Sequence, residues 1–435
     1  MRAFKDSGIQ WLGEIPEHWE IKPLRAILNQ RNEQNNDLKL QTILSLVKDI
    51  GIIPYEEKGN VGNKSKNDLQ GYKIARINDL VLNKMNAVIG SLGVSVYNGL
   101  VSPIYLVFYI DNPKYLMSYY YYLFQIKSVQ KFLKTFAYGI MEIRESIDYL
   151  DFKKMFLPTP PIEEQKAIAD FLDSKCKQIE SFVDKKQKLI TLLNEKKQAL
   201  INECVTKGFN KNVKYKDSGV EHLGAIPTHW EIKKLKMLFS FGNGLNITKA
   251  DFVSYGVPCV SYGEIHSKYS CRLDLSIHTL PFVSETYLAD KPQSLLQKGD
   301  FVFADTSEDI EGSGNFTSIQ SDMPIFAGYH TITLKPKANR IHSPYFSFLF
   351  DSNFTRNQIR KEVCGVKVFS ITKAILKEIQ CIIPPLQEQK QIAEFLDSEI
   401  SKIDSIIEKI KKQIELIKEY KSTLINQAVC GRINL

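Results

Sequence analysis

The chain has 435 residues, of which 43% are hydrophobic and 24% are charged, and its formal net charge at pH 7 is +8. This composition indicates two or three folded domains, and it excludes both a disordered chain and a strongly basic, histone-like one. The mild basic excess permits nucleic-acid binding without establishing it.

The N-terminal segment lacks the apolar stretch of a secretory signal peptide, and no run of 18 apolar residues occurs in the chain. The seven cysteines are an odd number and form no CxxC pair. A disulfide framework or a zinc site is therefore disfavoured, and the histidines form no metal-binding spacing either. We expect a cytoplasmic protein with no metal site and no contact with a membrane.

Two blocks of sequence occur twice. Residues 5–24 read KDSGIQWLGEIPEHWEIKPL and residues 216–235 read KDSGVEHLGAIPTHWEIKKL, at an offset of 211 residues. The block PPIEEQKAIADFLDS at Pro160 returns as PPLQEQKQIAEFLDS at Pro384, at an offset of 224. The segments between, 36–158 and 247–382, hardly align. Such a repeated frame with unlike inserts favours two similar tasks of different specificity, although an old duplication whose inserts drifted without purpose is an alternative.

Each Pro-Pro pair begins a long segment without proline, which predicts helices over about 162–207 and 386–431. Acidic residues in the first turn (Glu163, Glu164, Glu388) suit the helix dipole, and Gly208 and Gly431 stand where C-terminal glycines are common. At 1.5 Å per residue, each helix is about 70 Å long.

Both helices carry apolar residues at the alternating spacing of four and three that is typical of a coiled coil. The predicted helix-pairing seam comprises Ile179, Val183, Ile190, Leu193 and Leu200 in the first copy, and Ile403, Ile407, Ile410, Ile414, Ile417 and Leu424 in the second. Lys197 and Lys421 occupy the same late seam position, and Lys186 interrupts the first copy only. We expect the helices to pair antiparallel about a pseudo-twofold axis, with a globular domain at each end. Separate bundles, or oligomerisation through each helix, are the alternative.

The predicted boundaries are a first domain over 1–160, a first spacer helix over 161–208, a second domain over 209–383 and a second spacer helix over 384–435. Of the net charge, +7 of +8 falls outside the two helical segments. The fold class that we predict is α+β: two mixed α/β domains separated by two long antiparallel helices, with a pseudo-twofold internal repeat.

These residues resemble the specificity subunit of type I restriction–modification enzymes, and the resemblance covers the whole chain. It rests on the twice-used KDSGxxxLGxIPxHWEIKxL and PPxxEQKxIAxFLDS blocks and on the divergent segments between them. The resemblance implies that each divergent segment is a target-recognition domain that reads one half of a split, asymmetric site in double-stranded DNA. It also implies helices that set the unread gap and dock two methyltransferase subunits. S-adenosylmethionine is then expected in those partners and no cofactor in this chain, with restriction/translocase subunits joining for cleavage.

No catalytic motif is evident in the sequence. Neither Pro-Pro pair is followed by the aromatic residue of an N6-adenine methyltransferase turn. Glu20-Ile21-Lys22 and Glu231-Ile232-Lys233 match half of a nuclease motif but lack a spaced partner aspartate, so we interpret them as structural. His18 and His229 each precede a tryptophan and are interpreted as packing residues. We therefore predict a chain that is not an enzyme by itself.

Candidate DNA-contacting residues lie in polar or basic loops between short apolar stretches, where base edges and phosphates could be reached. Those of the first domain are Lys48, Lys64, Lys66, Lys84, Asn86, Tyr138 and Arg144; those of the second are Lys249, Tyr262, Lys268, Arg272, Glu308, Lys367 and Ser370. For each, a solvated surface or a role in the fold is an equal alternative. A non-enzymatic coiled-coil scaffold with two protein-binding domains is the alternative for the whole chain.

Overall fold

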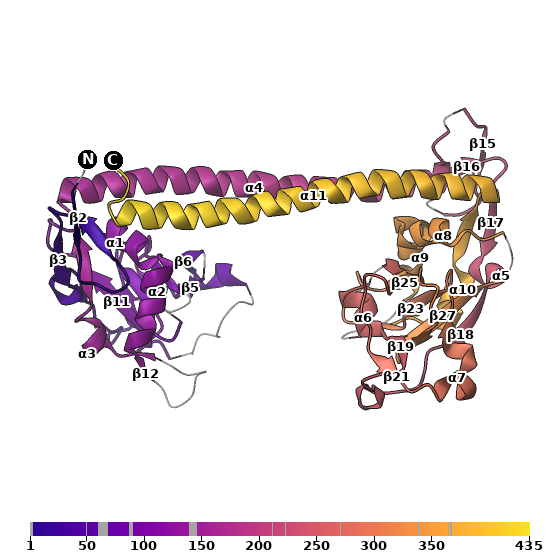
Figure 1. The fold of residues 1–435 in the computed structure, drawn as a ribbon, viewed down its shortest axis with the longest axis horizontal. Coiled ribbons are helices and arrows are strands. Elements are labelled where there is room, and N and C mark those ends of the chain that lie inside the picture. Colours follow the sequence, from indigo (N-terminus) through magenta and orange to yellow (C-terminus); the bar gives the residue numbers. More distant parts are fainter. Residues whose placement is uncertain are drawn as a thin grey trace. The chain divides into compact units, whose positions relative to one another are not determined.

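A computed structural model provides the structure, and it describes residues 3–48, 50–59, 68–86, 90–138, 146–210, 212–221, 223–269, 271–337, 340–363, 365 and 368–435. The chain forms two compact units (Figure 1). Unit 1 comprises Met1–Gln187 and Lys411–Leu435, and unit 2 comprises Lys188–Ile410. Among the described helices, none is long and apolar enough to cross a lipid bilayer.

Unit 1 contains a small antiparallel sheet whose strand order is β4-β11-β8-β9. Its strands are β1 Phe4–Asp6, β2 Glu14–Pro16, β3 Glu20–Pro23, β4 Asn29–Gln30, β5 Leu44–Val47, β6 Gly51–Pro54, β7 Lys73–Ala75, β8 Leu80–Asn83, β9 Leu92–Val94, β10 Gly99–Val101, β11 Tyr105–Tyr109, β12 Ala137–Tyr138, β13 Ser146–Ile147 and β14 Phe156–Thr159. Its short helices are α1 Met117–Phe124, α2 Lys127–Leu133 and α3 Tyr149–Phe152. Residues of the central strand β8 alternate between two cores: Leu80 and Leu82 join the cluster that includes α1, and Val81 joins one with β5 and β6.

Unit 2 contains a larger sheet in the order β18-β27-β23-β25-β20, in which only the last pair is parallel. Its strands are β15 Tyr215–Asp217, β16 Ala225–Pro227, β17 Glu231–Lys234, β18 Phe239–Asn243, β19 Val257–Val260, β20 Cys271–Leu273, β21 Phe282–Val283, β22 Leu295–Leu296, β23 Phe301–Ala304, β24 Thr306–Ser307, β25 Phe316–Ile319, β26 Ile325–Ala327, β27 Thr331–Pro336, β28 Phe369–Ser370 and β29 Gln380–Ile383. Its short helices are α5 Leu235–Leu238, α6 Tyr262–Ser267, α7 Tyr287–Asp290, α8 Ser343–Asp351, α9 Asn353–Glu362 and α10 Lys373–Glu378. Phe301 and Phe303 of β23 pack with α8, whereas Val302 and Ala304 pack with Ile265 of α6.

The two long helices are α4, Ile162–Lys207, and α11, Leu386–Val429. The first has the predicted bounds, and the second ends two residues before the predicted Gly431. Gly208 and Gly431 follow the helices with φ of +71° and +70°, the left-handed conformation of a C-terminal glycine.

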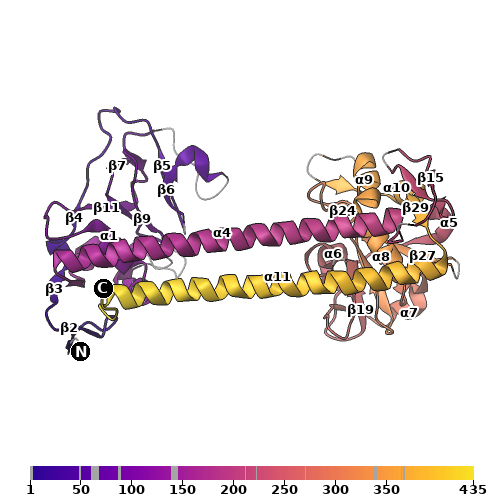
Figure 2. The same ribbon diagram turned by 90° about the horizontal axis from the view of Figure 1, so that it is seen from above.

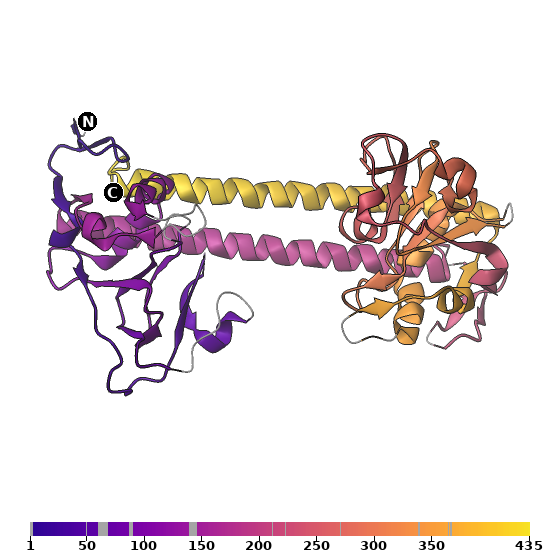
Figure 3. The same ribbon diagram turned by 90° about the horizontal axis from the view of Figure 1, so that it is seen from below.

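Within each unit, portions of α4 and α11 lie side by side and antiparallel (Figures 2 and 3). In unit 1, Leu172 near the start of α4 shares a core with Leu424 and Ile425 near the end of α11. In unit 2, Ile201 near the end of α4 shares a core with Leu396 of α11. Each helix end is therefore part of a domain core and is not a free coiled coil.

Ion pairs repeat this arrangement in both units. Lys197 Nζ bonds both carboxylate oxygens of Asp404 at 2.9 Å in unit 2, and Lys421 Nζ bonds Glu180 Oε1 at 2.8 Å in unit 1. The offset of 224 residues converts one pair into the other, so the two pairings occupy equivalent positions of the sequence repeat. The predicted seam residues are all buried or half-buried, namely Ile179, Val183, Ile190, Leu193, Leu200, Ile403, Ile407, Ile410, Ile414, Ile417 and Leu424.

The repeated leading segment is attached to the first turn of the helix of its own half. The indole Nε1 of Trp19 donates to Glu164 at 3.0 Å, and that of Trp230 donates to Glu388 at 2.8 Å. His18 and His229 bond the same two glutamates at 2.5 and 2.6 Å and are partly exposed. The ring of His229 also packs edge-on against that of Trp230 at 6.4 Å, so the hydrogen bonds to the glutamates add to the predicted packing role.

Candidate nucleic-acid interface

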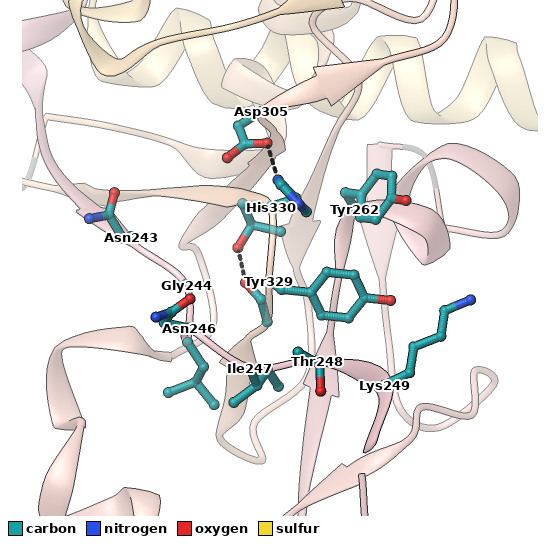
Figure 4. Close-up of a pocket in the computed structure, with 13 residues that line it drawn as sticks. Asn243, Gly244, Asn246, Ile247, Thr248, Lys249, Tyr262, Asp305, Tyr329 and His330 are labelled. Carbon is teal, nitrogen blue, oxygen red and sulfur yellow. Dashed lines mark hydrogen bonds and ion pairs between the residues drawn. The ribbon is translucent and has the colours of Figure 1, made fainter. Parts of the chain in front are cut away.

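A polar cavity of about 720 Å³ lies at one edge of the main sheet of unit 2 (Figure 4). It is lined by Asn243, Gly244, Leu245, Asn246, Ile247, Thr248, Lys249, Tyr262, Asp305, Gly328, Tyr329, His330 and Thr331. These residues meet because β18 and β23 end where the antiparallel β27 begins. Several of the side chains can donate or accept hydrogen bonds, which base edges and phosphates require.

Asp305 and His330 are paired on the wall of this cavity. His330 Nδ1 lies 3.2 Å from Asp305 Oδ1, and the backbone N–H of Asp305 donates to the carbonyl of His330 at 3.1 Å. His330 has φ of +54°, which is uncommon for a residue with a side chain and is often found at functional sites. The rings of Tyr262 and Tyr329 lie 5.4 and 6.0 Å from the imidazole (Figure 4). The pair is therefore held from two sides and remains partly exposed.

A chain of polar contacts holds the strand that follows Asp305. Arg356 Nη1 donates to Asn315 Oδ1 at 3.0 Å, so the amide nitrogen of Asn315 faces His266 Nδ1 at 2.9 Å. His266 Nδ1 must then be the acceptor, and its Nε2–H donates to the carbonyl of Thr306 at 2.8 Å. These contacts fix β24 and the strand end that carries Asp305.

The corresponding edge of unit 1 carries lysines. Lys84 directly follows β8, and its side chain is half-exposed. Lys73 Nζ donates to the carbonyl of Tyr105 at 2.8 Å. Burial lowers the pKa of Lys73, and the charge of Lys84 lowers it further, so the two ammonium groups are close enough to interact. Two lysine side chains therefore lie near this edge.

The candidates of the second domain fall into three groups. Lys249 and Tyr262 line the cavity, and Ser370 pairs with Thr306 beside it. Lys268 and Glu308 are exposed outside the cavity lining. Arg272 forms an ion pair with Asp397 of α11 and lies over the ring of Phe348 at 5.1 Å, so the structure gives it a role in attaching the sheet to the helix.

In the first domain, Lys48 and Asn86 are exposed, and Lys48 lies in the turn between β5 and β6. Tyr138 is in β12, where only its backbone is described. The candidates Lys64, Lys66, Arg144 and Lys367 lie outside the described residues. DNA contact remains a prediction for every candidate in both domains.

The sequence did not single out Asp305, Tyr329 or His330 as candidates. They are far from Asn243 in the chain, and no motif links them. The Trp19–Glu164 junction was also missed, although both residues belong to repeated blocks and their common repetition was the available signal. The two ExK segments form short ion pairs, Glu20–Lys22 at 2.7 Å and Glu231–Lys233 at 2.5 Å, on the strands β3 and β17.

A family model described as the type I restriction modification DNA specificity domain matches residues 16–191 and again residues 227–416. This chain belongs to the family of type I restriction–modification specificity subunits. The double match covers both halves of the repeat, each with its divergent domain and most of its helix. The alternative of a scaffold with two protein-binding domains is not favoured by this membership.

Relatives and solved structures agree with the family assignment. The type I restriction enzyme MjaVIII specificity subunit of Methanocaldococcus jannaschii is 28% identical over 334 residues, covering 75% of this chain and 73% of the relative. The putative MjaX specificity subunit of the same organism is 25% identical over 451 residues, covering 98% and 96%. A chain from a type I R-M system aligns with a TM-score of 0.72 at 12% identity, over 96% of this chain and 99% of that one. The HsdS subunit from Thermoanaerobacter tengcongensis aligns with a TM-score of 0.52 at 12% identity, over 98% and 100%. At this identity, the structural matches establish the fold alone.

Proposed function

We propose that this specificity subunit reads DNA for its complex and catalyses no reaction itself, with each unit reading one half of a split, asymmetric site in double-stranded DNA. One observation carries the proposal. The main sheets of the two domains share an equivalent order of four strands, to which unit 2 adds β20, yet they place different polar side chains at the same sheet edge. Two similar sheets with different polar side chains at their edges are suited to recognising two different DNA sequences.

The proposed partners follow from family membership. Two methyltransferase subunits dock on α4 and α11 and supply S-adenosylmethionine, and the target adenine is flipped into those subunits and not into this chain. Restriction/translocase subunits join for cleavage, and the complex works in the cytoplasm. The contribution of this chain is binding, orientation and spacing of the DNA.

Exchanging one domain tests the reading of half-sites. Residues 31–146 would be replaced by the matching segment of another family member, which preserves the repeated frame on both sides, and methylated adenines would be mapped across a genome. We expect one half-site to change and the other to persist. A fully unchanged site, or the loss of both halves from a folded complex, contradicts the proposal.

Lengthening the helices tests their role as a ruler. One heptad inserted at equivalent positions of α4 and α11 keeps their antiparallel pairing and adds about 10 Å, roughly three base pairs. We expect a longer gap between unchanged half-sites. The same insertion in α4 alone serves as the control, and it should lower stability because it breaks the seam register. An unchanged gap in the doubly extended complex contradicts the ruler.

The salt dependence of affinity tests the DNA contact itself. Each phosphate contact made by Lys or Arg releases counterions, so the affinity of the assembled complex should fall steeply as salt rises. Binding to a cognate duplex and to a scrambled duplex would be titrated in parallel. A flat response for both duplexes contradicts DNA reading.

A further inference from the structure

The central strands of the two main sheets share one register, although their sequences do not align. In unit 1, Leu80 to Asn83 of β8 pair with Phe108 to Tyr105 of β11. In unit 2, Phe301 to Ala304 of β23 pair with Leu334 to Thr331 of β27. Three residues of each central strand also pair with the next strand, β9 or β25. Asn83 therefore corresponds to Ala304, and the next residues, Lys84 and Asp305, correspond to each other.

A backbone hydrogen bond gives the same correspondence independently. The N–H of Ile147 donates to the carbonyl of Lys84 at 3.0 Å, and the N–H of Ile371 donates to the carbonyl of Asp305 at 2.7 Å. Ile147 and Ile371 are separated by 224 residues, which is the offset of the repeated helix block. Both isoleucines are buried, so they hold the two strand ends in the same place.

The residues at this equivalent position, Lys84 in unit 1 and Asp305 in unit 2, have opposite charge and opposite hydrogen-bonding capacity. Lys84 offers only donors, and Lys73 is near enough for its pKa to be lowered by the charge of Lys84. Asp305, when ionised, offers only acceptors, and it lies on the wall of the 720 Å³ cavity with His330 beside it. A carboxylate would repel a phosphate, whereas it can accept a hydrogen bond from the amino group of a base.

We propose that Lys84 and Asp305 are equivalent specificity-determining residues, Lys84 selecting an acceptor edge such as guanine O6 and N7, and Asp305 selecting an exocyclic amino group of cytosine or adenine. This inference rests on the proposed function, because it names the side chains that would act in each half-site. The positioning residues are then His330, which contacts Asp305 directly, and Arg356, Asn315 and His266, whose hydrogen bonds hold the strand end that carries Asp305. The opposite charges of Lys84 and Asp305 would allow two similar sheets to recognise different bases.

The variant Asp305→Asn tests one half-site in the complete complex. Asparagine keeps the shape and one acceptor oxygen of aspartate but adds a donor, so it should favour a different base. In methylation maps we expect discrimination to fall by roughly 10- to 100-fold at one position of one half-site, with the other half-site unchanged. The base that the parent complex requires at that position shows whether Asp305 selects cytosine or adenine. Uniformly weaker methylation with an unchanged motif overturns the proposal for Asp305, and so does unchanged methylation.

Lys84 is tested in the same way with two substitutions. Lys84→Gln should relax one position of the other half-site, and Lys84→Arg should preserve the preference for an acceptor edge because arginine also donates. If Lys84→Gln lowers methylation equally at all sites, Lys84 is a phosphate contact and the proposal is wrong for it. If Lys84→Gln leaves both the motif and the extent of methylation unchanged, the proposal is also wrong for Lys84.

Two controls separate this inference from folding and from the proposed function. Asp322→Asn and Lys131→Gln each remove one exposed charge from the same units and should leave the motif unchanged. Hydrogen exchange of the β8 and β23 peptides should match the parent chain in every variant. If the parent complex shows no two-part motif, the proposed function fails. If it shows one that neither Asp305→Asn nor Lys84→Gln alters, only this inference fails.

Discussion

Gly431 lies against the indole of Trp19, so closely that a Cβ added at Gly431 would approach Cζ2 of the ring to 2.8 Å. The same added atom would lie 2.6 Å from Cγ of Pro16. Gly208 of unit 2 is the equivalent glycine, and it lies beside the indole of Trp230. A Cβ added at Gly208 would be 3.2 Å from Cζ2 of that ring, which is a looser contact. The end of each long helix therefore closes on the leading segment of the other half, and the two copies of this contact differ in tightness.

The glycine pair gives a graded stability prediction. Gly208→Ala and Gly431→Ala both place a side chain at positive φ, which should lower the free energy of unfolding by about 1–2 kcal/mol. Gly431→Ala should add about 1–3 kcal/mol of steric strain against Pro16 and Trp19. Hydrogen-exchange mass spectrometry measures each unit separately. A larger loss for Gly208→Ala than for Gly431→Ala contradicts this account of the contacts.

The junction between tryptophan and glutamate should also stabilise unit 2. Glu388→Ala leaves the buried indole N–H of Trp230 without its acceptor, which should cost about 1–3 kcal/mol. Glu394→Ala removes an exposed glutamate from the same helix and should cost less than about 0.5 kcal/mol. Protection of peptides around Trp230 is the measurement. Equal effects of the two substitutions would show that the hydrogen bond contributes nothing.

The seam lysines favour specific pairing over stability. The Lys197–Asp404 pair is partly exposed, so Asp404→Asn should lower stability by less than about 1 kcal/mol. Lys197→Leu replaces the charged seam residue of unit 2 with an apolar one and should raise the stability of that unit by about 1 kcal/mol. Lys421→Leu should have a similar effect in unit 1, where Lys186 remains as a polar seam residue. Urea unfolding provides the measurement. Lower stability in both leucine variants would mean that the ion pairs outweigh apolar packing.

The stability of unit 2 should depend on pH through His342. Burial lowers the pKa of His342 from its usual 6.5, and the charge of Lys390 lowers it further. The pKa of His342 is lower in the folded chain than in the unfolded chain. Its contribution to the free energy of unfolding is therefore fully present above pH 6.5, and it is lost as the pH falls through the pKa of the folded chain. We expect a loss of at most about 1.4 kcal/mol per pH unit over this range, which His342→Gln should reduce.

Tryptophan fluorescence can isolate this effect. The three tryptophans are Trp11, Trp19 and Trp230, and only the last belongs to unit 2. In a background with Trp11→Phe and Trp19→Phe, urea unfolding at several pH values reports Trp230 alone. The same pH dependence with and without His342→Gln would assign the loss to another group.

The amino-acid sequence by itself determined the repeated frame and the long helices. The offsets of 211 and 224 residues, the Pro-Pro starts and the glycine ends are local signals, and the four-three spacing of apolar residues specifies the seam face of a helix. α4 has the predicted bounds for this reason. The sequence also predicted the borders of the divergent domains, from the positions at which the repeated blocks stop.

Only the tertiary structure decided which residues of the divergent domains meet. Lys84 and Asp305 correspond through strand register, which depends on alternation of apolar residues and not on their identity, so it persists where no alignment can be made. His330 reaches Asp305 because antiparallel pairing brings the start of β27 beside the end of β23, across 25 residues of chain. Arg272 was one of the predicted candidates for a DNA contact, and packing places it against Asp397 and Phe348. Local patterns specify the repeated frame, whereas sheet pairing between distant segments brings together the polar residues at the edge of each main sheet.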